Sequence, residues 1–348
     1  MKIKSIIFFL FYFTFVFSQN ETPNYSTIDS LARTVEYKGD LYQLTTELTQ
    51  NCNTKLEKAR AIFIWVTHSI KYDYKLINKN KKTKPFRCRN NQNCDAKYVK
   101  WKNKYINKTL KSKKAICHGY ATLFKQMCDY VGIQSSIISG YTKKSHSQIG
   151  RMGSLNHAWN AIHINGEYYF LDPTWAAGYC SIDKKEKLLK YVKKYEDYYW
   201  LTPSDKFSRN HYPEDEFWAR YSGNKEDFRK TPYIKTSYLP HLEIITPKSG
   251  IINIKAGDTL HFNVKYNQPI EHLQINTNIY RNPIPWTDDE TSRTWNERAL
   301  KKQKYINFKY QNEIYSFDYI VKKDYLRYID ILFDYKRVIR FRCTNQGK

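Results

Sequence analysis

A histidine and an aspartate lie on one face of a predicted β-hairpin. Residues 157–164 and 167–172 have the pattern of two strands joined by Asn165-Gly166, the strongest short signal for a two-residue hairpin turn. In this register His157 and Asp172 point to the same face as diagonal neighbours, about 7–8 Å apart at Cα. A carboxylate held against an imidazole fixes the tautomer of the ring and stabilises its charged form. The spacing therefore predicts a histidine general base and an aspartate that orients it.

A cysteine stands at the start of a predicted amphipathic helix. Residues 117–131 carry an apolar face at helical spacing, and Gly132 follows as a stop signal. The free N–H groups and the dipole at a helix N-terminus favour an anion, and thiolate is the nucleophilic form of cysteine. If this helix packs across the hairpin face that holds His157, then Cys117, His157 and Asp172 form a catalytic triad. Local spacing does not say which strand the helix meets.

Each of these residues also has a structural interpretation. Cys117 is compatible with a buried core thiol, His157 with a hydrogen-bonded core histidine, and Asp172 with the opening of a turn before Pro173. The shared facing of the histidine and the aspartate favours the catalytic interpretation. His118 is adjacent to the cysteine, and adjacent helical residues do not face each other, so we expect it to be a wall of the site.

Further elements must position these side chains. Residues 53–70 combine a capping box, Thr54-x-x-Glu57, with apolar residues at intervals of three and four, which predicts a helix facing a core. Residues 135–141 predict a strand, and the polar, glycine-containing stretch 145–155 predicts a loop before the hairpin.

The stretch from residue 75 to residue 114 is strongly basic. It holds fifteen lysines and arginines against one acid, Asp95, in a chain with 58 basic and 33 acidic residues and a net charge of +25. Its weak apolar periodicity predicts a long basic loop or an irregular insertion. Because it ends three residues before Cys117, we expect a basic, solvent-facing rim near the active site that attracts acidic substrates. The alternative is that these lysines reflect genome composition and only keep the loop solvated.

The composition changes again between residues 230 and 240. Beyond this point apolar residues alternate along 260–266 and 273–279, and 325–335 and 338–341 are also strand-like. This tail predicts an all-β domain, most simply a small sandwich. The expected organisation is a signal peptide at 1–18, a catalytic domain at 19–235 and a β-rich domain at 236–348.

The first residues have the layout of a secretory signal peptide. Lys2 and Lys4 precede a mostly apolar run at 6–17, and a small residue, Ser18, provides the cleavage site. We therefore expect a secreted or periplasmic protein whose mature form has no transmembrane segment, because no run approaches the roughly 20 apolar residues that cross a bilayer. Export permits disulfides, and Cys88 with Cys94 is the best candidate pair. Spacing leaves the pairing of the other cysteines open.

Three blocks around the candidate residues resemble the signature blocks of the transglutaminase-like superfamily. In order they are Lys114-Ala-Ile-Cys117-His-Gly-Tyr-Ala121, Asn156-His157-Ala-Trp-Asn160 and Tyr169-Phe-Leu-Asp172-Pro-Thr-Trp175. The resemblance is closest to the kyphoscoliosis-peptidase-type branch, in a secreted bacterial form, and covers roughly residues 25–222. It implies a papain-like α+β core with Cys117 as nucleophile, His157 as general base and Asp172 as orienting residue. It implies no cofactor and no metal.

The resemblance implies a thiol enzyme that acts on carboxamide or amide bonds of proteins and peptides. A thioester on Cys117 would be released by an amine or by water, which gives an acyltransferase or a peptidase. The alternative is a non-catalytic cell-surface binding or adhesion module that keeps the fold. The expected partners are a protein or peptide substrate of acidic character and an anionic envelope polymer. No nucleic-acid-binding motif is present.

Overall fold

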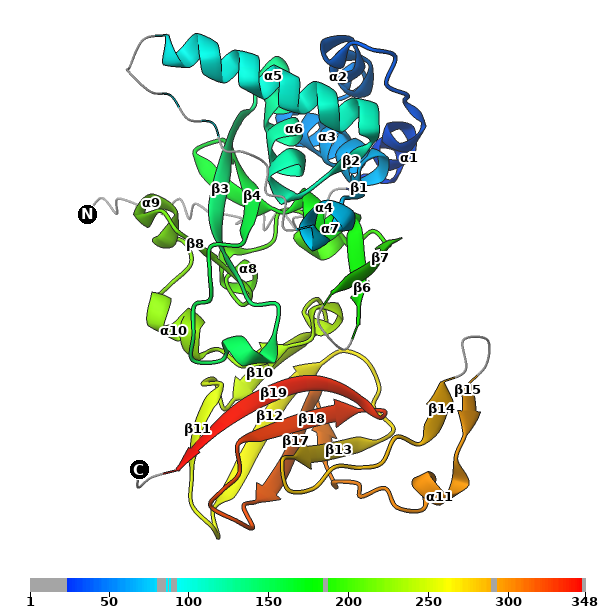
Figure 1. Ribbon diagram of the computed structural model, residues 1–348, viewed down its shortest axis with the longest axis vertical. Helices are drawn as coiled ribbons and strands as arrows, with labels where there is room; N and C mark the ends of the chain where they lie inside the picture. The colour runs from blue at the N-terminus through cyan, green and yellow to red at the C-terminus, as the bar shows by residue number, and fades with distance from the viewer. Residues whose placement is uncertain are drawn as a thin grey trace, which may run out of the picture.

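The computed structural model describes residues 24–79, 86, 88, 93–183, 187–288 and 293–345. The predicted signal peptide at 1–18 lies outside the described residues. One hydrophobic core is built between Ala32 and Phe207, and a second between Leu242 and Cys343. Figure 1 shows the helical region that contains the first core in the upper half and the strands that enclose the second in the lower half. The α+β core with a β region after it, expected from the sequence, is confirmed.

Four helices pack beside one antiparallel sheet in the first core. The sheet has the strand order β5-β4-β3-β8, with β3 at Gln134–Thr142, β4 at His157–Ile164, β5 at Glu167–Leu171 and β8 at His211–Pro213. The helices are α1 (Ser26–Thr34), α2 (Leu41–Thr49), α3 (Lys55–Ser69) and α6 (Cys117–Tyr130). The predictions for α3, with its complete capping box, and for α6 are confirmed. Both helices are buried along most of their length, which seats α6 firmly on the sheet.

The basic stretch before Cys117 differs from its prediction. After the short helix α4 (Tyr74–Asn78), the 19-residue helix α5 occupies Cys94–Ser112, so the expected loop or irregular insertion is wrong for this segment. Only Ile106, Thr109 and Leu110 of α5 are buried, and such a short apolar stripe gives no clear period in the sequence. Lysine is a good helix former, so the lysines on the exposed surface favour the helix. The residues at 80–85, 87 and 89–92 lie outside the described part.

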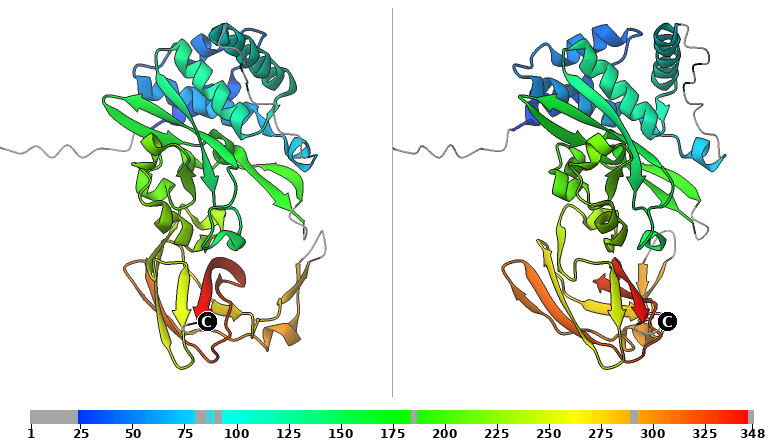
Figure 2. Two further views of the ribbon diagram at one scale, coloured as in Figure 1. Left: turned by 60° about the vertical axis from the view of Figure 1, so that its left-hand side comes forward. Right: turned by 90° about the vertical axis from the view of Figure 1, so that its left-hand side faces the viewer.

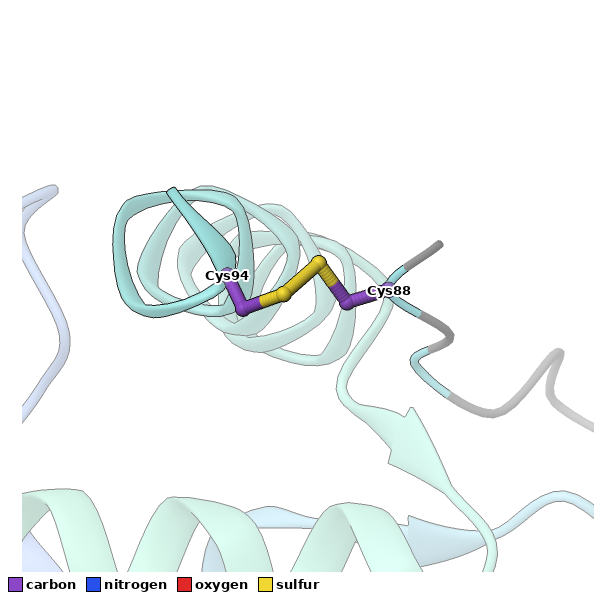
Figure 3. Close-up of a disulfide and its surroundings, with 2 residues drawn as sticks. All are labelled: Cys88 and Cys94. Carbon is purple, nitrogen blue, oxygen red and sulfur yellow. A yellow bond between two sulfur atoms is a disulfide. The ribbon is translucent and has the colours of Figure 1, made fainter. Parts of the chain in front are cut away.

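The start of α5 is tied to the preceding chain by a disulfide. Cys88 and Cys94 are bonded with their Cα atoms 5.7 Å apart, which confirms the predicted pair (Figure 3). Cys94 is the first residue of the helix, so the bond joins the helix N-terminus to the segment before it. Among the described residues, Cys52, Cys117, Cys128, Cys180 and Cys343 are free thiols.

The C-terminal region is a two-sheet β structure. One sheet has the order β10-β12-β17-β16 and the other β11-β19-β18-β13, and their apolar faces enclose the second core. The predicted strands correspond to β12 (Thr259–Tyr266), β13 (Leu273–Thr277), β18 (Tyr328–Phe333) and β19 (Lys336–Asn345). The remaining strands are β10 (Leu242–Thr246), β11 (Ile251–Ile254), β16 (Lys309–Gln311) and β17 (Ile314–Ile320). Figure 2 shows these sheets beneath the helical part in two further orientations.

Short elements connect the two regions. Strand β9 (Tyr233–Ile234) pairs with β19, so the chain joins the C-terminal sheet just before the predicted domain boundary at residue 235, which stays a prediction.

The remaining short elements before this boundary are β1 (Lys71–Tyr72), β2 (Lys114–Ala115), α7 (Pro173–Ala177), β6 (Gly178–Ile182), β7 (Leu188–Lys193), α8 (Ser204–Phe207), α9 (Glu216–Ala219) and α10 (Lys225–Lys230). Within the described ranges, no helix has the length and apolar character to cross a membrane.

Candidate active site

The hairpin that carries His157 and Asp172 has the predicted register. Ile164 pairs with Glu167 around the Asn165-Gly166 turn, and the pairing continues to Asn160 and Leu171. Asp172 follows β5 directly and is the N-cap of α7, where Oδ1 accepts hydrogen bonds from the backbone N–H groups of residues 174 and 175. Its Oδ2 lies 2.6 Å from Nε2 of His157. The predicted contact between the carboxylate and the ring is confirmed.

Helix α6 brings Cys117 to the same imidazole. Cys117 is the first residue of the helix, and its thiol is hydrogen-bonded to His157. Because Nε2 of the ring is hydrogen-bonded to Asp172, the hydrogen bond with the thiol involves Nδ1. The structure thus joins the three predicted residues in one hydrogen-bonded chain and answers which strand the helix meets, namely β4. Their catalytic roles stay a prediction.

The electrostatics of this chain favour an ion pair. Burial opposes ionisation of Cys117, but the hydrogen bond and charge of His157, the Lys144 ammonium and the backbone N–H of Ala158 outweigh it and lower the pKa of the thiol. Burial also lowers the pKa of His157, but the charge and hydrogen bond of Asp172, followed by those of Cys117, raise it to about 9. Both shifts favour a thiolate beside an imidazolium, which is the reactive form of the pair.

A second histidine contacts the same aspartate. Nε2 of His211, on β8, lies 3.1 Å from Oδ2 of Asp172, and the side-chain amide of Asn210 lies 2.6 Å from its Nδ1. Burial is the main influence on His211 and lowers its pKa to about 4, so the ring is neutral. A neutral ring has a single N–H, so it can donate to Oδ2 of Asp172 or to Oδ1 of Asn210 but not to both. Burial opposes ionisation of Asp172, yet His157 and His211 together hold its pKa well below the usual range.

His157, Asp172 and His211 also form the kind of cluster that can hold a metal ion, with ligand atoms within 4.8 Å of one another. Both imidazoles approach the same carboxylate oxygen, at 2.6 and 3.1 Å. Ligands that share one ion are each about 2.0–2.2 Å from the metal and therefore about 3 Å or more from each other, so the 2.6 Å contact of His157 with Asp172 is that of a hydrogen bond. The geometry favours hydrogen bonding over metal binding.

The loop after β3 places a cation beside the thiol. Lys143 is buried, and its ammonium lies 2.7 Å from the carbonyl of Phe228 and 2.6 Å from Oγ1 of Thr231. This anchor fixes the loop where the exposed Lys144 is within electrostatic reach of Cys117. Neither lysine was singled out from the sequence, because the loop reaches the site only through contacts with residues far along the chain.

Aromatic rings enclose the imidazole of His157. The ring of Trp175 lies 5.4 Å from that of His157, and Trp159 packs over Gly140, the residue paired with His157 across β3 and β4. A side chain at position 140 would collide with Trp159, so this glycine permits the close approach. These contacts hold the ring orientation that the hydrogen bonds require.

His118 lies outside the hydrogen-bonded chain, as expected for a wall of the site. Its ring stacks on Tyr105 of α5 with the centroids 5.9 Å apart, and Tyr105 stacks in turn on Trp101. A row of rings along α5 therefore reaches the residue next to Cys117. Burial lowers the pKa of His118, which keeps the ring neutral.

Two groups can stabilise the oxyanion that forms when a carbonyl is attacked. The backbone N–H of Cys117 belongs to the first residue of α6 and has no acceptor within the helix. Tyr72 lies on β1, which pairs with β2 at Ala115, two residues before Cys117. Burial first, and then the negative charges of Cys117, Cys180 and Asp172, raise the pKa of Tyr72, so its hydroxyl remains a hydrogen-bond donor.

The pKa values predict a bell-shaped pH dependence of kcat/KM. The acid limb reflects ionisation of Cys117 and lies below the usual thiol pKa, because the hydrogen bond and charge of His157 lower the pKa of this thiol. The alkaline limb reflects loss of the His157 proton as the pH rises through about 9, since the leaving nitrogen then has no proton donor. Steady-state kinetics between pH 5 and pH 10 checks this, and an activity that still rises from pH 9 to pH 10 would contradict it.

Comparison with known proteins agrees with this geometry. Residues 42–173 match the family model of the transglutaminase-like superfamily, a segment that contains Cys117, His157 and Asp172. This segment is therefore similar to the transglutaminase-like superfamily, as the sequence motifs indicated. Kyphoscoliosis peptidase of Mus musculus is 30% identical over 196 residues, which are 56% of this chain and 26% of that relative. Kyphoscoliosis peptidase of Homo sapiens is 30% identical over 200 residues, which are 57% of this chain and 27% of that relative.

The chain spans about a quarter of the length of these curated relatives. A solved structure described as a crystal structure of a TGase covers 54% of this chain and 40% of its own, with 15% sequence identity and a TM-score of 0.28. A TM-score this low does not establish a common fold.

Proposed function

We propose that this protein is a thiol enzyme that transfers or hydrolyses acyl groups of protein or peptide carboxamides through a thioester on Cys117. The observation that carries the proposal is the buried chain of hydrogen bonds from Cys117 through His157 to Asp172. The charges and hydrogen bonds around Cys117 outweigh its burial and lower the pKa of the thiol, and such tuning is typical of a nucleophile. A structural thiol has no need of a lowered pKa. Cys128 is an example, because burial raises the pKa of its thiol well above the usual value.

The proposed reaction has two halves. The thiolate of Cys117 attacks the carbonyl carbon, and the oxyanion accepts hydrogen bonds from the Cys117 N–H and the Tyr72 hydroxyl. His157 gives its Nδ1 proton to the leaving nitrogen, the C–N bond breaks, and ammonia or an amine departs from the thioester. An amine or water then attacks, His157 takes its proton, and the thiolate leaves.

We propose export as the setting of this activity. The Cys88–Cys94 disulfide suits an oxidising compartment, and the N-terminal residues have the composition of a signal peptide. The non-catalytic alternative, an adhesion module, has less support because such a module does not require a charged, hydrogen-bonded cysteine.

Mass spectrometry of a glutamine-containing protein substrate tests the proposal. The purified protein is incubated with this substrate in the presence and absence of a primary amine. Transfer adds the mass of the amine minus ammonia to a glutamine, deamidation adds about 1 Da, and peptidase activity shortens the chain. No change of any kind in the substrate, against an active transglutaminase as reference, would favour the adhesion module.

A basic surface beside the site is expected to select acidic substrates, and we propose this as part of the function. Lys104, Lys108 and Lys111 are exposed on α5, which is followed within five residues by Cys117. Clustered charge of one sign raises the local concentration of an oppositely charged substrate, and salt screens the attraction.

We expect roughly tenfold higher kcat/KM for an acidic than for a matched basic glutamine peptide at low salt, with the ratio falling toward one near 1 M salt. Changing Lys104, Lys108 and Lys111 together to glutamate should reverse the preference. Changing the exposed Lys309 on β16 to glutamate serves as control. A ratio that does not vary with ionic strength would indicate that these lysines only keep the segment solvated and do not select the substrate.

A further inference from the structure

The C-terminal region contains a polar cavity that the proposed chemistry does not use. Its volume is about 350 Å³, and it lies against the outer face of the sheet formed by β13, β18 and β19. We propose that this cavity is a binding site for an acidic sugar, a pyranose that carries a carboxylate. The proposal goes beyond the acyl-transfer function and does not depend on it.

The floor of the cavity is built by the strand register. Gln274 pairs with Leu332, Asn276 with Asp330, and Asp330 with Arg340, so these side chains share one face of the sheet. The opposite face, which includes Ile275 and Ile331, packs in the hydrophobic core. The outer face of a sandwich usually meets water, which explains why its residues here are polar.

This polar face is nevertheless covered. Between β13 and β16 the chain makes an excursion through β14 (Trp286–Asp288), β15 (Arg293–Trp295) and α11 (Glu297–Leu300), which Figure 1 shows projecting beside β13. Residues of this excursion, among them Trp286 and Gln303, line the cavity together with the strands. As a result Gln274 is fully buried.

The floor presents a hydrogen-bond acceptor without a donor. The amide nitrogen of Gln274 donates to Oε1 of Gln303 at 2.6 Å, but Oε1 of Gln274 has no hydrogen-bond partner among the described residues. A buried acceptor left without a donor costs stability, so its presence next to a cavity points to a ligand that donates a hydrogen bond. A sugar hydroxyl is such a donor.

The rim of the cavity is positively charged. Arg340 is neutralised by Asp330, with Nε and Nη2 at 2.5 and 2.6 Å from the two carboxylate oxygens. Two further guanidinium groups line the cavity, those of Arg281 and Arg337, and Arg337 is only loosely associated with Asp330 at 3.9 Å. Both of these arginines are exposed. Arginine binds carboxylates through paired N–H donors, so the rim suits one carboxylate on the ligand.

Aromatic side chains complete the wall. Trp286 and Tyr335 meet edge to face with ring centroids 5.9 Å apart, and both line the cavity. Aromatic rings offer a broad apolar surface with a polar edge, which suits the C–H face of a pyranose. The volume lies at the small end of the range of about 300–1,000 Å³ for small-molecule sites and suits one or two sugar rings. A ligand that matches this cavity therefore has a hydroxyl donor, a carboxylate and an apolar face, and an acidic sugar has all three.

Titration of tryptophan fluorescence or calorimetry with digalacturonate tests the proposal, with galactobiose as the matched neutral disaccharide. We expect saturable binding of digalacturonate at least about tenfold tighter than of galactobiose, because charge-assisted hydrogen bonds contribute more than neutral ones. Arg281→Gln and Arg337→Gln should each remove most of this preference by weakening the binding of digalacturonate. Lys309→Gln, on the other sheet, is the control and should bind as the wild type does.

Several outcomes would overturn the proposal. They are the absence of saturable binding to the wild-type protein at millimolar digalacturonate, equal affinity for the two disaccharides, and an affinity unaffected by the arginine substitutions. Tighter binding of tetra-aspartate than of digalacturonate would assign the cavity to acidic peptides instead. The comparison of the two disaccharides on the wild-type protein tests the proposal even if a variant fails to fold. Binding is measured without any acyl-transfer assay, so failure here is distinct from failure of the proposed enzymatic function.

Discussion

Replacing Cys117 by alanine is expected to reduce acyl transfer or hydrolysis to the background of the assay, a loss of about 10⁶-fold in kcat. The reason is that the thiolate forms the covalent intermediate, and an alanine side chain offers no nucleophile in its place. The substitution should preserve the fold, because the small side chain is accommodated at the first position of α6. Thermal denaturation and product analysis by mass spectrometry check the two expectations together.

Cys180 provides a matched control. It is half-buried on β6, and like Cys117 it acts electrostatically on Tyr72, but burial raises its pKa to about 11. Cys180→Ala should therefore turn over substrate as the wild type does. In the wild-type protein near pH 7, iodoacetamide should label Cys117 much faster than Cys180. Labelling of Cys117 at no more than the rate of the unfolded chain would show that the nucleophile is assigned wrongly.

The hairpin and the two main helices of the first core could be predicted because their signals are local. The Asn165-Gly166 turn sets the pairing of β4 with β5, and the capping box at Thr54 and Glu57 marks the start of α3. These signals involve residues that are close in sequence. They were sufficient to place His157 and Asp172 together.

The parts that the sequence could not predict depend on contacts between distant residues. His211 reaches Asp172 only because β8 pairs with β3, and 39 residues separate the two side chains. Helix α5 was missed because a helix with a short buried face and many lysines lacks a clear apolar period. The cavity in the C-terminal region requires an excursion to fold back over a sheet face, which no local pattern shows.

Replacing Asp172 by asparagine is expected to lower kcat/KM by about 10⁴-fold while the protein stays folded. Asparagine can keep the hydrogen bonds that Oδ1 accepts from the backbone at the start of α7, so the cap is retained. Its amide group, however, would offer an N–H to Nε2 of His157 in place of a carboxylate oxygen. The ring would then carry its proton on Nδ1 in the neutral form and could not accept a proton from the thiol of Cys117.

The same substitution removes the charge that raises the pKa of His157, so the imidazolium becomes less stable and the alkaline limb of the pH profile should move below pH 9. A merely structural role for Asp172 would lower activity without moving this limb. Asp129→Asn is the control, because that carboxylate lies at the end of α6 and pairs only with Lys125 among the described residues. Near-wild-type turnover by Asp172→Asn, under conditions where Cys117→Ala is inactive, would remove Asp172 from the mechanism and leave the thiol and the imidazole as a catalytic dyad.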